Sequence, residues 1–138
     1  HKGTNLALAL RHAARLLRQR AVVIVLSDFR GAGWESPLTS LAHKHEVVAI
    51  TVDDPRETDL PDVGWIELED AETGGRLLVN TSDAAARMQL RIAADKVRLA
   101  RARALEHSHV DQIALKSDEP YAQPLHQAFA KRARRLAR

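Results

Sequence analysis

The sequence predicts an α/β protein of three layers, with a mostly parallel sheet between flanking helices and a small β-hairpin insertion. Two runs, "AVVIVL" at 21–26 and "EVVAITV" at 46–52, are apolar, rich in β-branched residues and without alternation. Such runs are typical of parallel strands that are buried on both faces. Segments with helical spacing separate them, and strands that alternate with helices imply βαβ units with right-handed crossovers.

The amino-terminal elements follow from spacing and capping. Leu6, Leu10, Ala13 and Leu17 recur at helical intervals, and Thr4 precedes them in a position typical of an N-cap. A loop that contains two glycines and a proline separates the first strand from a short helix. We therefore expect helices at about 5–19 and 36–44, around strands at 21–26 and 46–52.

The carboxyl-terminal half begins with a half-exposed hairpin, formed by "WIELED" at 65–70 and "RLLVN" at 76–80. Ser82 or Asp83 then caps a long helix at about 83–107, followed by a strand at 110–115 and a last helix at about 121–137. Pro120 and Pro124 fit the first turn of that helix. We expect the long helix to face inward with Leu90, Ala94, Val97 and Ala104 and outward with Arg87, Arg91, Arg98 and Arg101, and the last helix to bury Leu125, Phe129 and Leu136.

The bulk composition favours one domain over residues 1–138, which is long enough to bury a core. The absence of cysteine excludes disulfides and thiolate metal sites and, with no secretory signal pattern, favours a cytoplasmic location. No apolar run approaches the roughly 20 residues that span a bilayer. The chain opens on "HKGTNLALAL" without an initiator methionine, so we interpret it as part of a longer protein.

Polar residues follow the predicted strands at their carboxyl ends, where open α/β sheets bind ligands. Asp28 ends the first strand, Asp53 and Asp54 end the second, and Lys116 follows the third. The first helix should run antiparallel to the first strand, so Thr4 can lie at the same edge. Oxygen ligands at one edge suit Mg²⁺. On spacing alone, however, local capping by Thr4 and Asp28 is the stronger interpretation.

The strings "GTNLALAL" and "VVIVLSDF" resemble the second half of a von Willebrand factor type A domain, a Rossmann-like fold. The metal-ion-dependent adhesion site of that fold combines a D-x-S-x-S loop, a Thr in a later loop and an Asp that ends the fourth strand. By resemblance, Thr4 corresponds to the second part and Asp28 to the third. The D-x-S-x-S loop is absent from this sequence, so the resemblance implies a truncated domain with a partial metal site.

Two further segments, "VVAITVDDPRETDLPDVGWIELEDAETGGRLLVNT" and "PLHQAFAKRARRL", resemble the bacterial family called domain of unknown function fifty-eight. Its members carry a von Willebrand A-like region and are commonly encoded beside MoxR-type AAA+ ATPases. The resemblance implies a non-enzymatic protein-interaction module that works with such an ATPase, with a divalent-metal site in the parent protein. It also implies a role beyond turning the chain for Asp70, Glu72 and Thr73.

Two expectations follow from the missing part of the parent fold. Thr4 and Asp28 provide only a fraction of a Mg²⁺ shell, so we expect this chain to bind the metal weakly or not at all. The strand at 21–27 loses the neighbour that it has in the parent fold and becomes an apolar edge. We therefore expect a homodimer in which residues 21–27 pair across a two-fold axis.

Other functions have weaker support. The acids at the strand ends, with Lys116, also resemble the pocket of a Mg²⁺-dependent phosphoryl-accepting receiver domain, although their order along the chain differs. The basic tail "KRARRLAR" suits nucleic acid, but few aromatic residues are available for stacking, and we interpret it as a solvated helix face or a contact for an acidic ATPase surface. No nucleophile–base pair indicates an enzyme. The pairs His43/His45 and His107/His109 are interpreted as surface residues.

Overall fold

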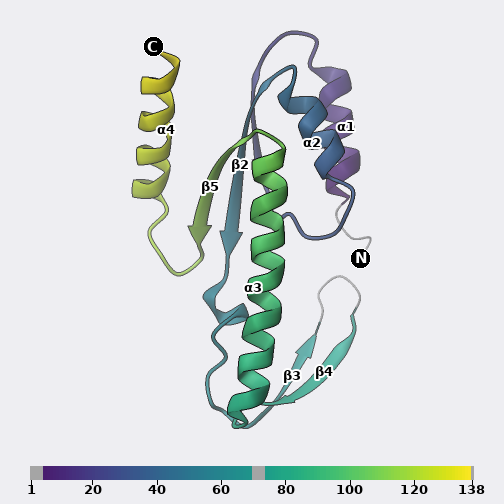
Figure 1. The fold of residues 1–138 in the computed structure, drawn as a ribbon, viewed down its shortest axis with the longest axis vertical. Coiled ribbons are helices and arrows are strands. Elements are labelled where there is room, and N and C mark those ends of the chain that lie inside the picture. Colours follow the sequence, from purple (N-terminus) through teal and green to yellow (C-terminus); the bar gives the residue numbers. More distant parts are fainter. Residues whose placement is uncertain (1–4, 70–73, 138) are drawn as a thin grey trace.

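The computed structural model describes residues 5–69 and 74–137. A three-stranded parallel sheet of order β1-β2-β5 forms the centre, and β3 and β4 form a separate antiparallel hairpin (Figure 1). Each predicted helix and strand is present, with ends that differ from the prediction by no more than three residues. The elements are α1 (Leu6–Leu16), β1 (Val22–Leu26), α2 (Glu35–Ala42), β2 (Glu46–Asp53), the 3₁₀ turn η1 (Pro55–Glu57), β3 (Trp65–Glu69), β4 (Arg76–Asn80), α3 (Ala84–His107), β5 (Asp111–Lys116) and α4 (Ala122–Leu136).

The register of the sheet brings the carboxyl ends of its strands to one edge. Leu26 pairs with Ile50 across β1 and β2, and Asp53 pairs with Lys116 across β2 and β5. The polar residues that follow these strands are therefore neighbours, as the sequence predicts for parallel strands. β2 is the central strand, and five consecutive residues of it, Val47–Thr51, are buried.

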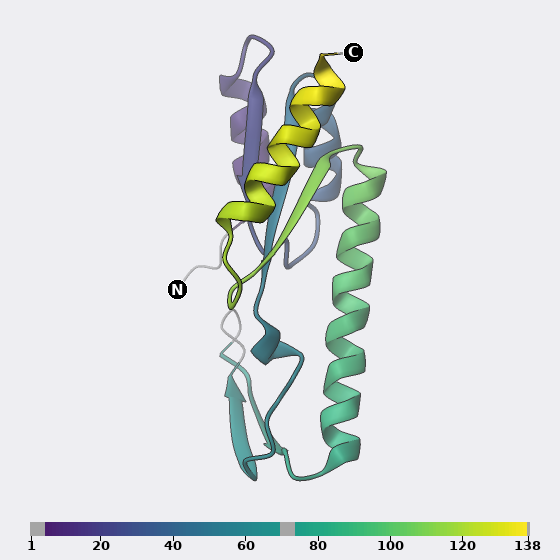
Figure 2. The ribbon, with the colours of Figure 1, turned by 90° about the vertical axis from the view of Figure 1, so that its left-hand side faces the viewer.

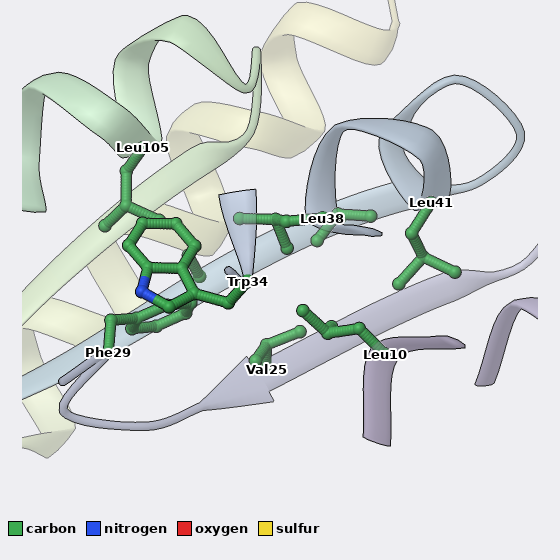
Figure 3. Packing of buried hydrophobic residues seen from close by; sticks show 9 residues of the cluster. Leu10, Val25, Phe29, Trp34, Leu38, Leu41 and Leu105 are labelled. Carbon is green, nitrogen blue, oxygen red and sulfur yellow. The ribbon is translucent and has the colours of Figure 1, made fainter. Parts of the chain in front are cut away.

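Helices α1 and α2 and the end of α3 cover one face of the sheet. Their shared core contains Leu10, Val25, Leu38, Leu41 and Leu105, all buried (Figure 3). The rings of Phe29 and Trp34 meet edge to face in the same cluster, with their centroids 5.1 Å apart. Such a pair stabilises the core beyond the area that it buries.

Helix α4 lies on the opposite face (Figure 2). Leu125 and Ala128 pack against Val48, Ile50, Ile113 and Leu115 of β2 and β5. The prediction that Phe129 is buried is wrong, since 37% of this residue is exposed. The side chain of Leu136 lies outside the described part of the structure.

The strand β1 departs from the prediction that both of its faces are buried. Val25 faces the α1–α2 core, whereas Val22, Ile24 and Leu26 are 59%, 54% and 67% exposed on the other face. The reason is that α4 covers β2 and β5, while β1 is the outer strand of the described sheet. Within the described residues, β1 therefore has one buried face and one exposed apolar face.

The long helix α3 contacts the main core only near its end, at Leu105, and runs from there to the hairpin (Figure 1). Two predictions about its faces are wrong: Val97 is exposed, and Arg101 points inward with only 12% of its side chain exposed. The other predicted inner residues, Leu90, Ala94 and Ala104, are partly buried. The caps are local: Asp83 caps α3 as predicted, while α1 is capped by Asn5 in place of Thr4, through a 2.9 Å bond from the Leu8 amide.

Candidate functional site at the carboxyl edge of the sheet

The backbone brings three chain segments together at the carboxyl edge. The amide of Ser27, directly after β1, donates to the carbonyl of Ile50 at 3.1 Å, and the amide of Ser117 donates to the carbonyl of Asp53 at 2.9 Å. These bonds continue the ladder by one residue beyond each outer strand. Asp28, Asp53 and Lys116 are thereby held within one local region, as their places at strand ends predicted.

Arg101 is the central residue of this edge, and the sequence reasoning missed it. Its guanidinium donates to both carboxylate oxygens of Asp53, at 2.7 and 2.8 Å, and to the backbone carbonyl of Asp28 at 3.0 Å. A bidentate, mostly buried pair of this kind is strong and geometrically specific. One signal was present: Arg101 stands four residues before Leu105, on the same side of the helix as the buried leucine.

Asp28 is engaged within its own turn. Its carboxylate accepts from the amide of Arg30 at 3.2 Å and lies 3.6 Å from the Nε atom of that residue. The neighbouring Ser27 hydroxyl accepts from the amide of Phe29, which has a positive φ of 51°. The turn-capping interpretation of an Asp after a strand therefore describes what Asp28 does locally. Its side chain is still 55% exposed and can be reached by another molecule.

Asp54 and Lys116, which were also predicted at this edge, form hydrogen bonds with residues close to them in the sequence. The Asp54 carboxylate accepts from the amide of Arg56 at 2.9 Å and caps η1. Lys116 donates to Glu119 at 2.7 Å, and this hydrogen bond, with the attraction between the charges, raises the pKa of Lys116 above its ordinary value. Lys116 is therefore protonated at neutral pH, and the contact is lost only in strongly alkaline solution, as the pH rises through that pKa.

The described residues do not by themselves fit a divalent-cation site. Thr4, the other predicted ligand, lies outside them, as do Asp70, Glu72 and Thr73. Residues 5–69 and 74–137 hold no group of three or more His, Asp or Glu side chains that could bind a metal ion. In addition, the positive guanidinium of Arg101 binds the carboxylate of Asp53 and the backbone carbonyl of Asp28, which opposes a metal cation between them.

The histidines were predicted to lie at the surface. His43, His107 and His109 are exposed as expected, but His45 is buried, and neither of its ring nitrogens has a hydrogen-bond partner. The surface interpretation of His45 is therefore wrong. Its amide donates to the carbonyl of Leu41 at 2.9 Å, so it continues the turn that leads from α2 into the buried strand β2.

The chain is an α/β protein with a parallel sheet, helices on both faces of the sheet and charged residues at its carboxyl edge. Sequence comparisons identify the family to which it belongs. The chain belongs to the family described as "Protein of unknown function DUF58", whose family model matches residues 1–100. The match ends within α3, so β5, α4 and the segment "PLHQAFAKRARRL" lie beyond it.

Mycobacterial proteins are among the relatives with similar sequences. An uncharacterised protein of Mycobacterium avium is 46% identical over 71 residues, which is 51% of this chain and 42% of that protein. An uncharacterised protein of Mycobacterium tuberculosis has the same identity over 71 residues, which is 22% of its length. This chain therefore spans less than half of the length of these relatives. No solved structure matches.

The described helices do not have the character of membrane-spanning segments. Within the described ranges, none of them combines the length and the apolar character that crossing a membrane requires. This includes α3, the longest, which carries charged residues throughout its length.

Proposed function

We propose that this chain is a non-enzymatic protein-interaction module of a von Willebrand A-like protein that acts with a MoxR-type AAA+ ATPase. Two findings support the proposal: membership of the DUF58 family, and a parallel sheet with helices on both faces and Asp28 at the carboxyl end of β1. The second is the arrangement that the resemblance implies. The relatives are longer, so the activity of the whole protein depends on segments outside this chain.

The basic surface of α4 is the observation that carries the proposal. Lys131 and Arg134 make no ion pair with any part of the chain that the structure describes, whereas Arg132 and Arg135 are paired with acids of the sheet. A groove of about 400 Å³ lies between α4 and β5. These four basic side chains and the partly exposed Phe129 are among the residues that line it. A partner surface with acidic side chains around an apolar residue would complement it in both charge and polarity.

The test is a binding measurement with a MoxR-type AAA+ ATPase from the same organism. The double variant Lys131→Glu/Arg134→Glu should weaken binding at least tenfold, because it places acids against an acidic partner. Lys96→Glu/Arg103→Glu is the matched control, since it makes the same charge change on exposed residues of α3. Equal affinity of the two double variants, or no binding by the native chain, would refute the proposed surface.

The metal is a separate part of the proposal. In the full-length protein, Thr4 and Asp28 would contribute to a Mg²⁺ shell that a D-x-S-x-S loop from another segment completes, and the metal would supply a coordination position for an acid of the partner. In this chain the exposed carboxylate of Asp28 is the part of such a site that the described residues contain.

A phosphoryl-accepting receiver domain is the alternative, and one observation favours it. Asp53 pairs in register with Lys116, and Asp28 lies at the same edge, so carboxylates and a lysine are neighbours. Against it, the carboxylate of Asp53 is bound by Arg101. Incubation with a small phosphodonor and Mg²⁺, followed by intact mass measurement, separates the two functions: a gain of about 80 Da, one phosphoryl group, on Asp28 or Asp53 would favour the receiver.

A further inference from the structure

The helices of both layers end where the strands of the parallel sheet begin. Val22 of β1 pairs with Glu46 of β2, and a helix leads directly into each strand, so α1, α2 and α3 end at this edge. Helix α4 ends there as well, because Arg132 contacts Glu46 and Asp111, the first residues of β2 and β5 (Figure 1). We call this region the amino edge; it consists of the connections 17–21, 43–45 and 108–110 and the last turns of α4.

Free basic side chains at the amino edge come from both sides of the sheet. On the α1–α2 side, Arg18 precedes β1 and Lys44 precedes β2. On the opposite side, Lys131 and Arg134 lie in the second half of α4. These side chains are exposed, and within residues 5–69 and 74–137 none of them has an ion pair or a side-chain hydrogen bond. A positive surface therefore extends across the edge from one helical layer to the other.

The acids that begin β2 and β5 do not neutralise this surface. Glu46 pairs with Arg20 at 3.3 Å and with Arg132 at 2.6 Å. Asp111 pairs with Arg132 and, at 2.7 Å, with Arg135. Each of the two acids is thus already shared by two arginines. The carboxyl end of a helix carries only about half of a negative charge, which one nearby cation exceeds.

The amino edge is remote from the candidate site at the carboxyl edge. β2 runs from one edge to the other, from Glu46 to Asp53, and its seven steps of about 3.3 Å separate the two edges by roughly 23 Å. A further strand beside β1 or β5 would extend the sheet sideways, so the place of the amino edge does not depend on the number of strands. A molecule bound at the amino edge leaves the exposed carboxylate of Asp28 accessible.

We propose that the acidic surface of the ATPase docks across the amino edge, where it meets the loops before β1 and β2 as well as α4. This inference rests on the proposed function and adds contacts on the side of the sheet opposite α4. An acidic tail in the groove between α4 and β5 would meet the cations of α4 alone, whereas a folded acidic surface meets those of both layers. The carboxyl edge then stays free for a second ligand.

The test compares the affinities of variants of the whole chain for a MoxR-type AAA+ ATPase from the same organism, in about 0.15 M salt. Arg18→Glu/Lys44→Glu should weaken binding at least tenfold, because it places two acids against an acidic surface. Both residues lie in loops, so the helices are not altered. Arg56→Glu/Lys96→Glu is the matched control, since it makes the same charge change on exposed residues away from the amino edge, and its affinity should stay within about twofold of the native value. Circular dichroism establishes that each variant is folded.

The outcomes separate this inference from the proposed function. If Lys131→Glu/Arg134→Glu weakens binding and Arg18→Glu/Lys44→Glu does not, docking across the edge is wrong and the proposed function stands. No binding by the native chain refutes the proposed function itself. A DNA duplex of about 20 base pairs, titrated in the same buffer, is the probe for another polyanion. Tighter binding to the duplex than to the ATPase would overturn the proposal in favour of nucleic acid.

Discussion

Arg101 determines how the carboxyl edge is arranged at the scale of single residues. Its guanidinium joins the backbone of the β1 loop to the carboxylate that ends β2, and only 12% of the arginine and 31% of the aspartate side chain are exposed. In this setting, removal of one partner leaves a partly buried charge without compensation, which costs more than the intact pair contributes. Asp28 and Asp53 are therefore fixed in place through a residue on a distant helix.

We predict that Arg101→Ala lowers the free energy of unfolding by about 1–3 kcal/mol, because Asp53 loses two charge-assisted hydrogen bonds. Arg98→Ala is the control: Arg98 pairs with Asp95 on the solvent side of the same helix and should change stability by no more than about 0.5 kcal/mol. Urea denaturation of both variants measures the difference. Equal effects would mean that the Asp53 contact is not formed in solution.

The candidate site was only partly predictable at this scale. The places of Asp28, Asp53 and Lys116 followed from strand ends, because parallel strands share an edge whatever else packs around them. The place of Arg101 could not be predicted in this way. Arginines recur along α3, and the sequence does not reveal which of them faces the sheet. That depends on where the last turns of α3 dock, which Leu105 decides.

Among the elements, α4 is held on the sheet by two different kinds of contact. Near its start, Leu125 and Ala128 pack on the apolar face of β2 and β5. Near its end, the largely buried Arg132 forms ion pairs with Glu46, at 2.6 Å, and with Asp111, the first residues of those two strands. The helix is therefore attached by its apolar side at one end and by a charge network at the other.

Replacement of Arg132 by alanine should release the second half of α4. We expect a loss of roughly 2–4 kcal/mol in the free energy of unfolding, since Glu46 and Asp111 keep partly buried charges that lose their main partner. Hydrogen exchange of the amides beyond residue 130 should accelerate. Arg135→Ala is the control, because Arg135 also contacts Asp111 but is itself well exposed. Comparable exchange in the two variants would contradict this role of Arg132.

The whole molecule consists of the three-stranded sheet with its helices and, beyond it, the β3–β4 hairpin, with α3 running from one to the other (Figure 1). The hairpin joins α3 through the buried Thr81, whose hydroxyl donates to the carbonyl of Gly64 at 2.7 Å and accepts from the amide of Val63 at 3.0 Å. These two hydrogen bonds connect the residue that follows β4 to the segment that precedes β3.

At this scale we predict that Mg²⁺ leaves the stability of the chain unchanged. A ligand that binds the native state raises stability with its concentration. The midpoint of thermal unfolding should therefore agree within about 1 °C between EDTA and about 10 mM MgCl₂, since one exposed carboxylate beside a guanidinium is a poor cation site. Calorimetry that shows micromolar Mg²⁺ affinity, abolished by Asp28→Ala, would contradict the prediction.

The sequence by itself determined the order and type of the elements and the edge at which Asp28, Asp53 and Lys116 meet, because β-branched apolar runs, helical spacing and caps are local properties. Tertiary structure decided which faces are covered. It exposed Val22, Ile24 and Leu26 of β1, buried His45 and turned Arg101 inward. Burial depends on which helix lies over which strand, and the same apolar pattern fits a strand that is covered on both faces and one that is covered on a single face.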